Sequence, residues 1–555
     1  MVQMSGGQAV VQTLITLGAR AGFGVPGESY LAVLDAFCDA PSFRFIGCRN
    51  EGGAAFMAEA WAKLTGEVGL CFVTRGPGAT NASIGVHTAM QASTPMLLFI
   101  GQVGLEHQGR EAFQELDYRQ VFGPIAKYVT EITDVSRTPE IVRRAWSLAI
   151  SGRPGPVVVA LPEDVLTQSA QMHIPDAPIL PPKSAAVVED LELLAAKFLS
   201  AKRPVILAGG GRWEVQDRNA LQACARKLNI PVLTGFRYHD LFDNTDPLFV
   251  GEAGVGMTAN TKHLLTEADV VLAVNLRFGE MTTNAFTLFG ADRGEQWIAQ
   301  SHRSGDEFHK YVAPNLSMIS DPAPLLDGLR TRLEGQSMGQ DPAWATSARA
   351  GFNAAQTAKP QPSPVDMSVV TSTLQAVLPP DAIVTNGAGN FAIWPNKFMQ
   401  FSEHQRLLAP QSGAMGYGLP AAIAAKVAYP ERCVVCFAGD GDFQMNGQEL
   451  GAALQAGARP IVLIVNNGSY GTIRMHQERH YPRRVSCTDM INPDFAVLAR
   501  AYGFHGERIE RTEDVADAFL RALASPTGAV LDLNVASEAI TPGMTIKDLR
   551  SLSDD

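Results

Sequence analysis

The segment Gly439-Asp440-Gly441 constrains the fold of this chain more than any other. It follows an apolar run over residues 433–438 that is typical of a buried parallel strand. A second apolar run over residues 460–465 ends at Asn466-Asn467, and the intervening segment 449–457 is predicted to be helical. Two parallel strands therefore end side by side, which is where open α/β sheets bind their ligands.

The polar residues at these two strand ends are suited to a metal ion and a diphosphate. Asp440 and Asn467 can offer side-chain oxygens to a hard cation that keeps an octahedral shell. Gly441 has no side chain and lets the backbone approach phosphate oxygens closely. A lone Gly-Asp-Gly would be read as an ordinary turn, so the prediction of a metal-diphosphate site depends on both strand ends together.

The complete pattern resembles the signature of the thiamin-diphosphate (ThDP)-dependent enzymes. The resemblance implies that Asp440, Asn467 and the main-chain carbonyl of Ser469 bind Mg²⁺. It further implies that Met415 holds the cofactor bent beneath its thiazolium ring. The residues expected to contact the cofactor, besides the two side-chain metal ligands, are Pro26, Gly27, Glu51, Asn81, Gly389, Asn390, Phe391, Gly413, Met415, Gly439, Gly441, Asp442, Tyr470 and Gly471.

Glu51 is the candidate acid-base carboxylate for this cofactor. ThDP becomes nucleophilic when its aminopyrimidine ring takes an imino form, which requires a carboxylate of raised pKa at the far ring nitrogen. Glu51 follows a strand-like run, 43–48, and opens a helix of small residues, 52–58. An isolated glutamate here would be read as a first-turn residue favoured by the helix dipole. Segments 73–81 and 95–101 resemble the pyrimidine-binding domain of the same superfamily and favour the catalytic interpretation.

The chain is predicted to fold into three parallel-sheet α/β domains of the ThDP-dependent decarboxylase and acetolactate synthase type. A proline-rich stretch, 175–183, and a polar stretch, 335–364, are the predicted linkers. The expected parts are a pyrimidine-binding (PYR) domain over 1–170, a central α/β domain over 185–335, a diphosphate-binding (PP) domain over 365–540 and a tail over 541–555.

The composition favours a large soluble enzyme. The 555 residues are 46% hydrophobic, which is sufficient for several domain cores, and the formal charge of −11 argues against nucleic-acid or membrane binding. No apolar run approaches a membrane span and residues 1–5 lack a basic leader, so a cytoplasmic location is expected. The seven cysteines are expected to be reduced core thiols, and Cys433 and Cys436 to pack in a strand rather than bind a metal.

Within the superfamily, the chain resembles the acetohydroxyacid (acetolactate) synthases over nearly its full length. By this resemblance Gln114 is a catalytic residue that hydrogen-bonds substrate, and Phe113 walls the substrate pocket. Lys127 aligns with a lysine near the family's substrate entrance, although an exposed lysine is as often a solvated surface charge. The resemblance also implies a homodimer in which Glu51 of one subunit meets Asp440 of the other, and a pair of such dimers. The matching segments are 49–60, 76–81, 112–117, 151–156 and 413–420.

The chemistry expected at such a site is acyl transfer from a 2-oxo acid. ThDP-bound 2-oxo acids lose CO₂ to give an enamine, which either takes a proton or attacks another carbonyl. A simple decarboxylase needs a proton donor, commonly histidine, yet the turn after Val73 presents Arg75-Gly76-Pro77 and the chain has no His-His pair. We therefore expect a carboligase or lyase with pyruvate as donor and a carbonyl acceptor.

Several other functions remain as alternatives at this point. Among enzymes these are a 2-oxo acid or acyl-CoA decarboxylase and a sulfoacetaldehyde-type acetyltransferase. A non-catalytic subunit with the same fold is a further alternative, because a fold does not establish an activity. That last alternative requires loss of the acid-base or metal residues, and Glu51, Asp440 and Asn467 are all present.

The chain departs from the synthase pattern in three places. His476 stands where the synthases carry a tryptophan that shapes the acceptor site, so it is a candidate for the substrate pocket and for acid-base catalysis; a solvated loop histidine is the alternative. Asn390-Phe391 replaces a Gln-His pair near the diphosphate, a change that main-chain contacts can survive. Arg277 matches a pocket arginine that binds FAD in biosynthetic synthases, but the glycine-rich turn and following acids differ, and Gly209-Gly210-Gly211 can equally be a tight turn. The sequence leaves FAD as a cofactor undecided.

Overall fold

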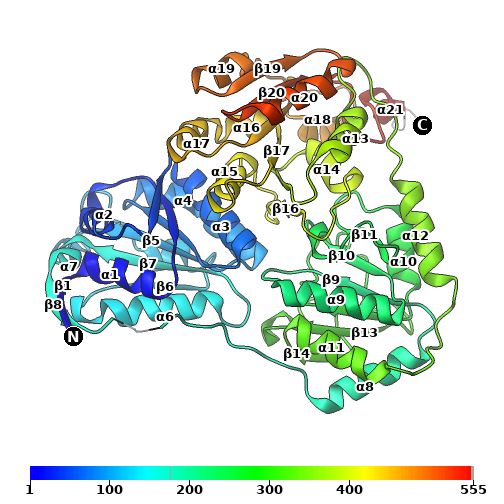
Figure 1. Cartoon of the computed structure of the whole chain (residues 1–555), viewed down its shortest axis with the longest axis horizontal. Coiled ribbons are helices and arrows are strands. Elements are labelled where there is room, and N and C mark those ends of the chain that lie inside the picture. Colours follow the sequence, from blue (N-terminus) through cyan, green and yellow to red (C-terminus); the bar gives the residue numbers. More distant parts are fainter. Residues whose placement is uncertain (175–176, 552–555) are drawn as a thin grey trace.

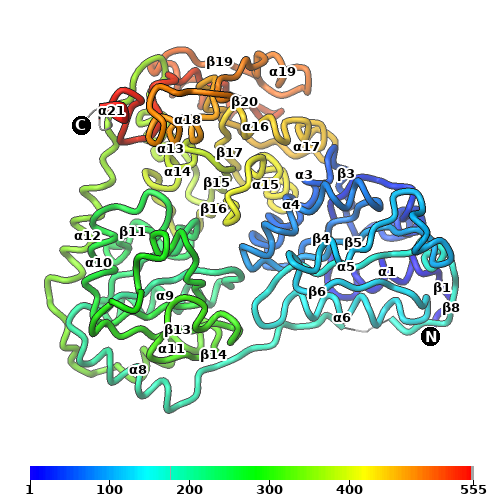
Figure 2. The backbone as a smooth tube through the Cα atoms, turned by 180° about the vertical axis from the view of Figure 1, so that it is seen from behind, coloured from blue at the N-terminus to red at the C-terminus, as the bar shows by residue number. Residues whose placement is uncertain are grey.

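The computed structural model describes residues 1–174 and 177–551 and has three lobes, each built on a six-stranded sheet (Figure 1). A long segment runs from the first lobe to the second, and the chain then returns through α12 (Trp344–Ala355) to the third (Figure 2). Every pairing within the three sheets is parallel. The predicted fold class is confirmed.

The first lobe contains the segment predicted to be the PYR domain, with strand order β3-β2-β4-β5-β7-β6. A short antiparallel ribbon of β1 (Val2–Ser5) and β8 (Ser169–Met172) joins the two ends of this lobe. Strand β4 is fully buried, as expected for a parallel strand with helices on both faces. The other elements are β2 (Ala21–Gly24), β3 (Arg44–Gly47), β4 (Gly69–Val73), β5 (Met96–Gln102), β6 (Tyr128–Glu131), β7 (Pro156–Pro162), α1 (Gly6–Thr16), α2 (Leu31–Cys38), α3 (Glu51–Thr65), α4 (Pro77–Ala92), α5 (Tyr118–Phe122), α6 (Thr138–Ile150) and α7 (Glu163–Thr167).

The second lobe has strand order β11-β10-β9-β12-β13-β14. It corrects the prediction that 335–364 is only a linker, because α12 lies inside that stretch and buries Trp344 and Phe352 in the core of this lobe. Of the other expected linker, Pro175 and Asp176 lie outside the described residues. The elements are β9 (Pro204–Ala208), β10 (Val232–Gly235), β11 (Phe249–Ala253), β12 (Val270–Val274), β13 (Trp297–His302), β14 (Leu316–Ile319), α8 (Val188–Ser200), α9 (Val215–Leu228), α10 (Ala259–Glu267) and α11 (Pro322–Leu333).

The third lobe contains the metal motif and has strand order β16-β15-β17-β18-β20-β19. Its strands β17 (Val434–Gly439) and β18 (Ile461–Asn466) are parallel neighbours, with Gly439 opposite Val465, so the two motif halves end at the same edge as predicted. The remaining elements are β15 (Ile383–Asn386), β16 (Arg406–Leu408), β19 (His505–Ile509), β20 (Ala529–Asn534), α13 (Met367–Val377), α14 (Ile393–Phe398), α15 (Gly418–Ala428), α16 (Asp440–Gln444), α17 (Leu450–Ala456), α18 (Gly471–His480), α19 (Phe495–Ala501), α20 (Val515–Ala524) and α21 (Ile546–Ser551).

A buried polar network joins the first and third lobes along α3 and α15. The Tyr417 hydroxyl donates to Glu59 Oε2 at 2.6 Å, and Lys63 Nζ lies 3.1 Å from Glu59 Oε1. Phe56 packs edge-on against the Tyr417 ring, with centroids 5.4 Å apart. Because a buried carboxylate is stable only when it is bonded and compensated, this network fixes the position of α3, which begins at Glu51.

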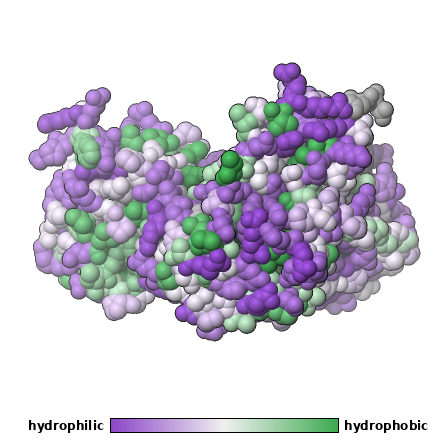
Figure 3. Space-filling view, turned by 90° about the horizontal axis from the view of Figure 1, so that it is seen from above, coloured by the Kyte–Doolittle hydropathy of each residue, from purple (hydrophilic) through white to green (hydrophobic). Residues whose placement is uncertain are grey.

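The cysteines agree only in part with the expectation of core thiols, because two of the seven are exposed. All seven cysteines are unpaired, and Cys436 is buried in β17 while Cys38 and Cys487 are exposed. The face seen from above is mostly hydrophilic with scattered hydrophobic patches (Figure 3). Across residues 1–174 and 177–551, none of the helices combines the length and apolar character that crossing a bilayer requires.

The C-terminal helix α21 packs on α18 through ion pairs and hydrogen bonds to a buried glutamate. Glu478, whose side chain is fully buried, accepts hydrogen bonds from Arg550 Nη2 at 2.7 Å and from Arg474 Nε at 3.1 Å. The bonds to Arg550, Arg483 and Arg474 outweigh desolvation and lower the pKa of Glu478 to about 2. An apolar cluster of Met475, Ile540, Ile546 and Leu549 completes the contact.

Glu478→Gln is expected to lower the free energy of unfolding by about 1–3 kcal/mol, because it leaves buried donors without their charged acceptor. The carboxylate's contribution is present above its unfolded pKa and is lost as pH falls towards the folded value of about 2. Urea unfolding at neutral pH measures the change, with the exposed Glu513→Gln as the control. Equal midpoints for the two variants would show that the network does not stabilise the fold.

Candidate functional site

Asp440 begins α16 directly after β17 and supplies the buried carboxylate of the site. It is 2% exposed, and its oxygens accept the Gly441 N–H at 3.0 Å, the Gly468 N–H at 2.9 Å and the Asn492 amide at 2.7 Å. Burial raises the pKa of Asp440, and these hydrogen bonds oppose the rise. No cationic side chain among the described residues pairs with it. A buried carboxylate without a counter-charge is costly and suits a bound cation.

The other two predicted metal ligands lie on the turn after β18. Asn467 Oδ1 accepts the Ser469 N–H at 3.1 Å, and the Ser469 hydroxyl is buried without a hydrogen-bond partner in the described part of the chain. A carboxylate, an amide oxygen and a main-chain carbonyl form the kind of all-oxygen set that Mg²⁺ takes. Within residues 1–174 and 177–551 no group of three His, Cys, Asp or Glu side chains could hold a metal instead. The residues present fit Mg²⁺.

Aromatic rings pack closely against two glycines of the motif. A Cβ placed on Gly441 would lie 2.7 Å from the Tyr470 ring, and one on Gly439 would lie 2.8 Å from the Phe391 ring. Any side chain at either position would force the neighbouring ring to move, so glycine is favoured at both. The two rings bring the turn after β18 and the loop after β15 against the motif.

The Asn390-Phe391 segment, which departs from the synthase pattern, is held by contacts of its own. The Asn390 N–H donates to Thr472 Oγ1 at 2.9 Å, and Asn390 Nδ2 donates to the Ile540 carbonyl at 2.8 Å. Thr472 follows Gly471 in the first turn of α18. Asn390 therefore links the predicted diphosphate loop to α18 and to the C-terminal segment by hydrogen bonds.

The loop that carries Met415 is fixed by Asp442. Asp442 Oδ1 accepts the Gly416 N–H at 2.8 Å and the Ala388 N–H at 3.1 Å, while Asn446 Nδ2 donates to the Gly416 carbonyl at 2.8 Å. Burial raises the pKa of Asp442 to about 7, and the two backbone bonds act in the opposite direction. Asp442 thereby joins the segments of Gly389 and Gly413 at the carboxyl edge of the sheet.

Glu51 and Asn81, both predicted from sequence, lie together at the N-termini of α3 and α4. Asn81 Nδ2 donates to Glu51 Oε2 at 2.9 Å, and a Cβ on Gly78 would lie 3.1 Å from Glu51 Oε1. Among the described residues, no hydrogen bond or ion pair joins Glu51 to Asp440.

Gln114 and Phe113 lie on the loop that crosses the carboxyl end of β4. Gln114 has a positive φ of 65°, and a Cβ on Gly76 would lie 2.7 Å from its carbonyl oxygen. Phe113 is 76% exposed. Gly27 belongs to the same edge, because a Cβ there would lie 2.7 Å from the Thr74 side chain. The structure thus brings these predicted residues to the strand ends that also present Glu51.

Lys127, which was predicted to lie near the substrate entrance, contacts the end of a helix. Its ammonium donates to the Leu148 carbonyl at 2.6 Å and to the Ser151 carbonyl, at the C-terminus of α6. Burial and the nearby Arg153 lower the pKa of Lys127 to about 8. These contacts give it a helix-capping role, because cations are favoured at helix C-termini.

His476 lies on the exposed face of α18, in the helix that follows the metal turn. Its ring stacks on that of His480, with centroids 6.2 Å apart. Desolvation lowers the pKa of His476, and the charges of Arg479 and His480 add to the effect. The neutral imidazole is therefore favoured at neutral pH, on a surface open to a partner or an acceptor.

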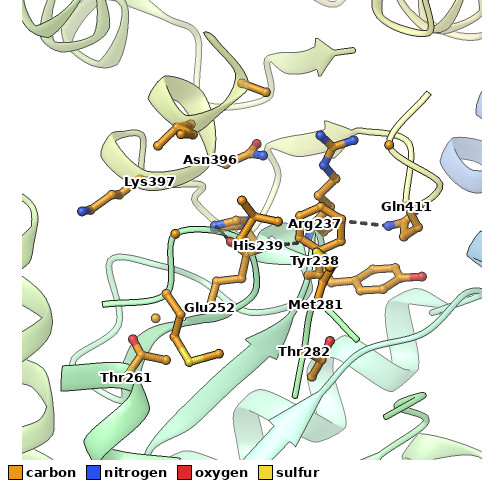
Figure 4. Close-up of a pocket in the computed structure, with 18 of the residues that line it drawn as sticks. Arg237, Tyr238, His239, Glu252, Thr261, Met281, Thr282, Asn396, Lys397 and Gln411 are labelled. Carbon is orange, nitrogen blue, oxygen red and sulfur yellow. Dashed lines mark hydrogen bonds and ion pairs between the residues drawn. The ribbon is translucent and has the colours of Figure 1, made fainter. Parts of the chain in front are cut away.

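A cavity of about 600 Å³ lies between the second and third lobes and includes Arg277, Gly389, Asn390 and Gly413 in its lining. In Figure 4 His239 and Glu252 lie side by side in its wall, with His239 Nε2 3.3 Å from Glu252 Oε2. Its volume falls in the range of about 300–1,000 Å³ that is usual for ligand sites. Gly389, Asn390 and Gly413, which were predicted to contact ThDP, are therefore part of its lining.

The residues that bear on FAD binding, Arg277 and the turn Gly209-Gly210-Gly211, contact other groups of the protein. Arg277 Nε donates to Glu307 at 3.2 Å and Nη1 to the Gln91 carbonyl at 2.6 Å. A Cβ on Gly210 would lie 1.9 Å from the Asn275 carbonyl oxygen, and one on Gly211 would lie 2.3 Å from that of Ser93. Close backbone packing therefore accounts for Gly210 and Gly211, and the feature that supports FAD is the cavity, whose lining includes Gly210, Gly256 and Arg277.

Three residues that support the site were not predicted from sequence. Asn492 bonds both Asp440 and the Asn466 side chain, at 2.7 and 2.9 Å. Asn446 holds Gly416, and Glu449 accepts the Asn50 N–H at 2.8 Å, just before Glu51. The local sequence around Asn492 indicates only a turn before a helix, and nothing in it points to a distant carboxylate.

Three family models match successive parts of the chain. Residues 4–121 match the N-terminal TPP binding domain of thiamine pyrophosphate enzymes, 191–329 match their central domain, and 387–533 match their C-terminal TPP binding domain. These three ranges fall within the first, second and third lobes. Glu51 lies within the first matched range and Asp440 within the third.

Curated relatives align with nearly the whole chain. The acetolactate synthase large subunit of Parasynechococcus marenigrum is 34% identical over 96% of this chain and 88% of its own length. The large subunit of Lactococcus lactis is 33% identical over 92% of this chain and 89% of its own length. The isozyme 3 large subunit of Escherichia coli is 31% identical over 94% of this chain and 93% of its own length. The chain therefore belongs to the family of thiamin-diphosphate-dependent enzymes, as a member similar to the acetolactate synthase large subunits.

Proposed function

We propose that this protein is a ThDP- and Mg²⁺-dependent carboligase that takes an acyl unit from a 2-oxo acid, with pyruvate as donor, and transfers it to a carbonyl acceptor. The observation that carries the proposal is the buried, uncompensated Asp440 carboxylate beside Asn467 and Ser469. The names of the relatives, all acetolactate synthases, support an acetolactate-type reaction.

Each group of the chain has a defined task in this proposal. Asp440, Asn467 and the Ser469 carbonyl would hold Mg²⁺, and Gly441 and Asn390 would lie against the diphosphate. ThDP, when bound, supplies the carbon nucleophile that attacks the 2-oxo acid. Glu51 Oε1, left open by the Asn81 bond to Oε2, would exchange a proton with the cofactor's aminopyrimidine ring.

Arg75 supports carboligation over simple decarboxylation. It follows β4 at the point where some decarboxylases place a histidine, is 8% exposed, and lies with Nη1 3.1 Å from Glu163. A guanidinium stays protonated and is a poor proton donor. The acyl unit would then persist long enough to meet an acceptor, which Gln114 and Phe113 would help to position.

The proposed active unit is a homodimer in the cytoplasm, with two dimers forming a tetramer. The resemblance to the acetolactate synthases implies that Glu51 of one subunit meets Asp440 of the other, so the partner subunit would complete each site. Exposed apolar side chains near these residues support such an interface: Ile84, Met445, Leu454 and Ile473 are 41–59% exposed. Sedimentation velocity of the holoenzyme tests the assembly, and a monomer at assay concentration would contradict it.

The activity is tested with purified protein, ThDP, Mg²⁺ and a panel of 2-oxo acids. CO₂ release identifies the donor, and chromatography separates aldehydes from acyloin products. A carboligase gives ligated products in excess over free aldehyde, whereas aldehyde alone would favour the decarboxylase alternative. Product formation that persists without ThDP and Mg²⁺ would contradict the proposed cofactor.

His476→Trp is expected to change acceptor choice while donor decarboxylation remains largely intact. A larger, less polar ring on α18 should shift the preference between two acceptors by about 1–3 kcal/mol, the scale for small differences in apolar size. The product ratio from paired acceptors competing for one donor measures this shift. His263→Trp, at an exposed position on α10, is the control. Unchanged ratios in both variants would place His476 outside the acceptor site.

A further inference from the structure

A second cavity, of about 540 Å³, lies at the junction of the three lobes. Its walls come from the C-terminal end of α3, from the start of α9, and from segments 403–406 and 429–432 of the third lobe. It shares no lining residue with the cavity of Figure 4. Its volume is again within the usual range of ligand sites, about 300–1,000 Å³.

Arg218 is the residue in this cavity whose charge is least compensated. It lies in the first turns of α9, where Nη1 donates to the Trp213 carbonyl at 3.1 Å. In the described part of the chain it forms no ion pair. Burial lowers the pKa of Arg218 to about 10, with a further contribution from the charge of Arg406, and the charges of Asp240, Asp217 and Glu403 act in the opposite direction. Most of its N–H groups therefore have no protein acceptor.

Three further guanidinium groups line the same space. Arg212 is paired with Glu214 at 2.9 Å, and Arg432 Nε lies 3.8 Å from Asp381 Oδ2. Arg406 Nε donates to Asp240 at 2.6 Å, and Asp240 lies behind the cavity wall rather than in its lining. Arg432 Nε and Nη2 donate to the carbonyls of Asp381 and His404, at 2.6 and 2.8 Å. The Arg406 and Arg432 side chains are 15% and 20% exposed. Their remaining N–H groups are available on the cavity side.

The acidic residues of the lining are at its exposed rim. The Asp381 side chain is 52% exposed and the Glu214 side chain 41%, and Glu403 is also exposed. Water and salt screen exposed charges much more than buried ones. Lys63, the remaining lysine of the lining, is compensated by Glu59. The buried part of the cavity is therefore cationic.

We propose that this three-lobe cavity binds a phosphate-bearing small molecule. Guanidinium groups match phosphate oxygens in paired hydrogen bonds. One carboxylate has only two oxygens to share, whereas a phosphate ester offers three oxygens and a charge of about −1.5 to −2, which suits several arginines. Trp213 and Tyr429 add aromatic surface for an organic group, and Arg432 already stacks over the Tyr429 ring at 5.3 Å.

The site has a direct structural link to the catalytic clusters. Thr65 and Gly66 of the lining form the C-terminal end of α3, the helix that begins at Glu51. A ligand bound to Arg218, Arg406 and Arg432 would join the second and third lobes beside that helix. Binding should therefore stabilise the folded protein, because a ligand that binds only the native state raises its stability.

The test is calorimetry on holoenzyme saturated with ThDP and Mg²⁺, with AMP, inorganic phosphate, adenosine and malonate as probes. We expect AMP and phosphate to bind and adenosine and malonate to bind weakly or not at all. Arg218→Gln and Arg432→Gln should each weaken AMP binding by about tenfold or more, since each removes charge-assisted bonds. Lys227→Gln, an exposed cation of the same helix outside the cavity, should leave it unchanged.

Asn219→Asp is a further variant that separates a loss of binding from a loss of folding. Asn219 is an exposed residue of the lining, and the added carboxylate leaves every arginine in place while repelling an anion. It should weaken AMP binding and keep the thermal midpoint of the ligand-free protein. The proposal is overturned if AMP and phosphate do not bind at millimolar concentration. It is also overturned if malonate binds as tightly, or if Lys227→Gln loses as much affinity as Arg218→Gln. No step measures turnover, so the outcome is independent of the proposed carboligation.

Discussion

Glu51→Gln is expected to retain the fold and ThDP binding but to slow cofactor activation by about 10²–10⁴-fold, the usual contribution of a positioned acid-base group. The amide cannot pass a proton between Oε1 and the aminopyrimidine ring. The substitution keeps the size of the side chain, and the Asn81 contact at 2.9 Å can persist through the amide oxygen. The N-terminus of α3 therefore keeps its geometry while losing its proton carrier.

Exchange of the thiazolium C2 proton, followed by NMR in the holoenzyme, measures this activation directly. Glu140→Gln is a matched control, because Glu140 is also a first-turn glutamate of a helix in the same lobe but is exposed and paired with Arg137. The control should exchange at the wild-type rate. A wild-type rate in Glu51→Gln would remove Glu51 from the acid-base role.

Asp440→Ala is expected to weaken Mg²⁺-dependent ThDP binding by more than about 100-fold. Loss of a group that only hydrogen-bonds a metal ligand lowers metal affinity or activity by about 10–100-fold in many sites. Asp440 would be a ligand itself, so a larger loss is expected. The alanine also removes the acceptor for the Gly441, Gly468 and Asn492 donors, which loosens the turn after β18.

Titration calorimetry of ThDP with and without Mg²⁺ separates the metal contribution from that of the rest of the pocket. Asp489→Ala is the control, because its side chain is 83% exposed and pairs only weakly with Arg474 near the same turn. We expect the control to bind as the wild type does. Unchanged affinity in Asp440→Ala would show that this carboxylate does not hold the cation.

The parts of the site that lie within a few residues of a strand end could be predicted from the sequence. Asp440 and Asn467 each follow an apolar run, and parallel pairing brings those two ends together by geometry alone. The prediction for Glu51 depends on the segments around it, which resemble the pyrimidine-binding domain of the superfamily. In each case the chemistry and the secondary structure are specified by the same short stretch.

Long-range contacts could not be predicted in this way. Asn492 reaches Asp440 from a separate loop, and Glu449 binds the backbone before Glu51 across two lobes. The polar stretch before the third lobe proved to contain α12, because Trp344 and Phe352 find a core that the local polarity does not reveal. Such positions depend on which surfaces the fold brings together, and no local pattern specifies that.

The proposed carboligation joins two carbon units with ThDP as the cofactor. The most direct test is NMR of [¹³C]pyruvate incubated with the purified holoenzyme. Acetolactate with a new ¹³C–¹³C coupling between donor and acceptor carbons, formed with one CO₂ per two pyruvates and only when ThDP and Mg²⁺ are present, is the predicted result. Acetaldehyde and CO₂ in equal amounts, without a coupled product from pyruvate or an added carbonyl acceptor, would contradict it.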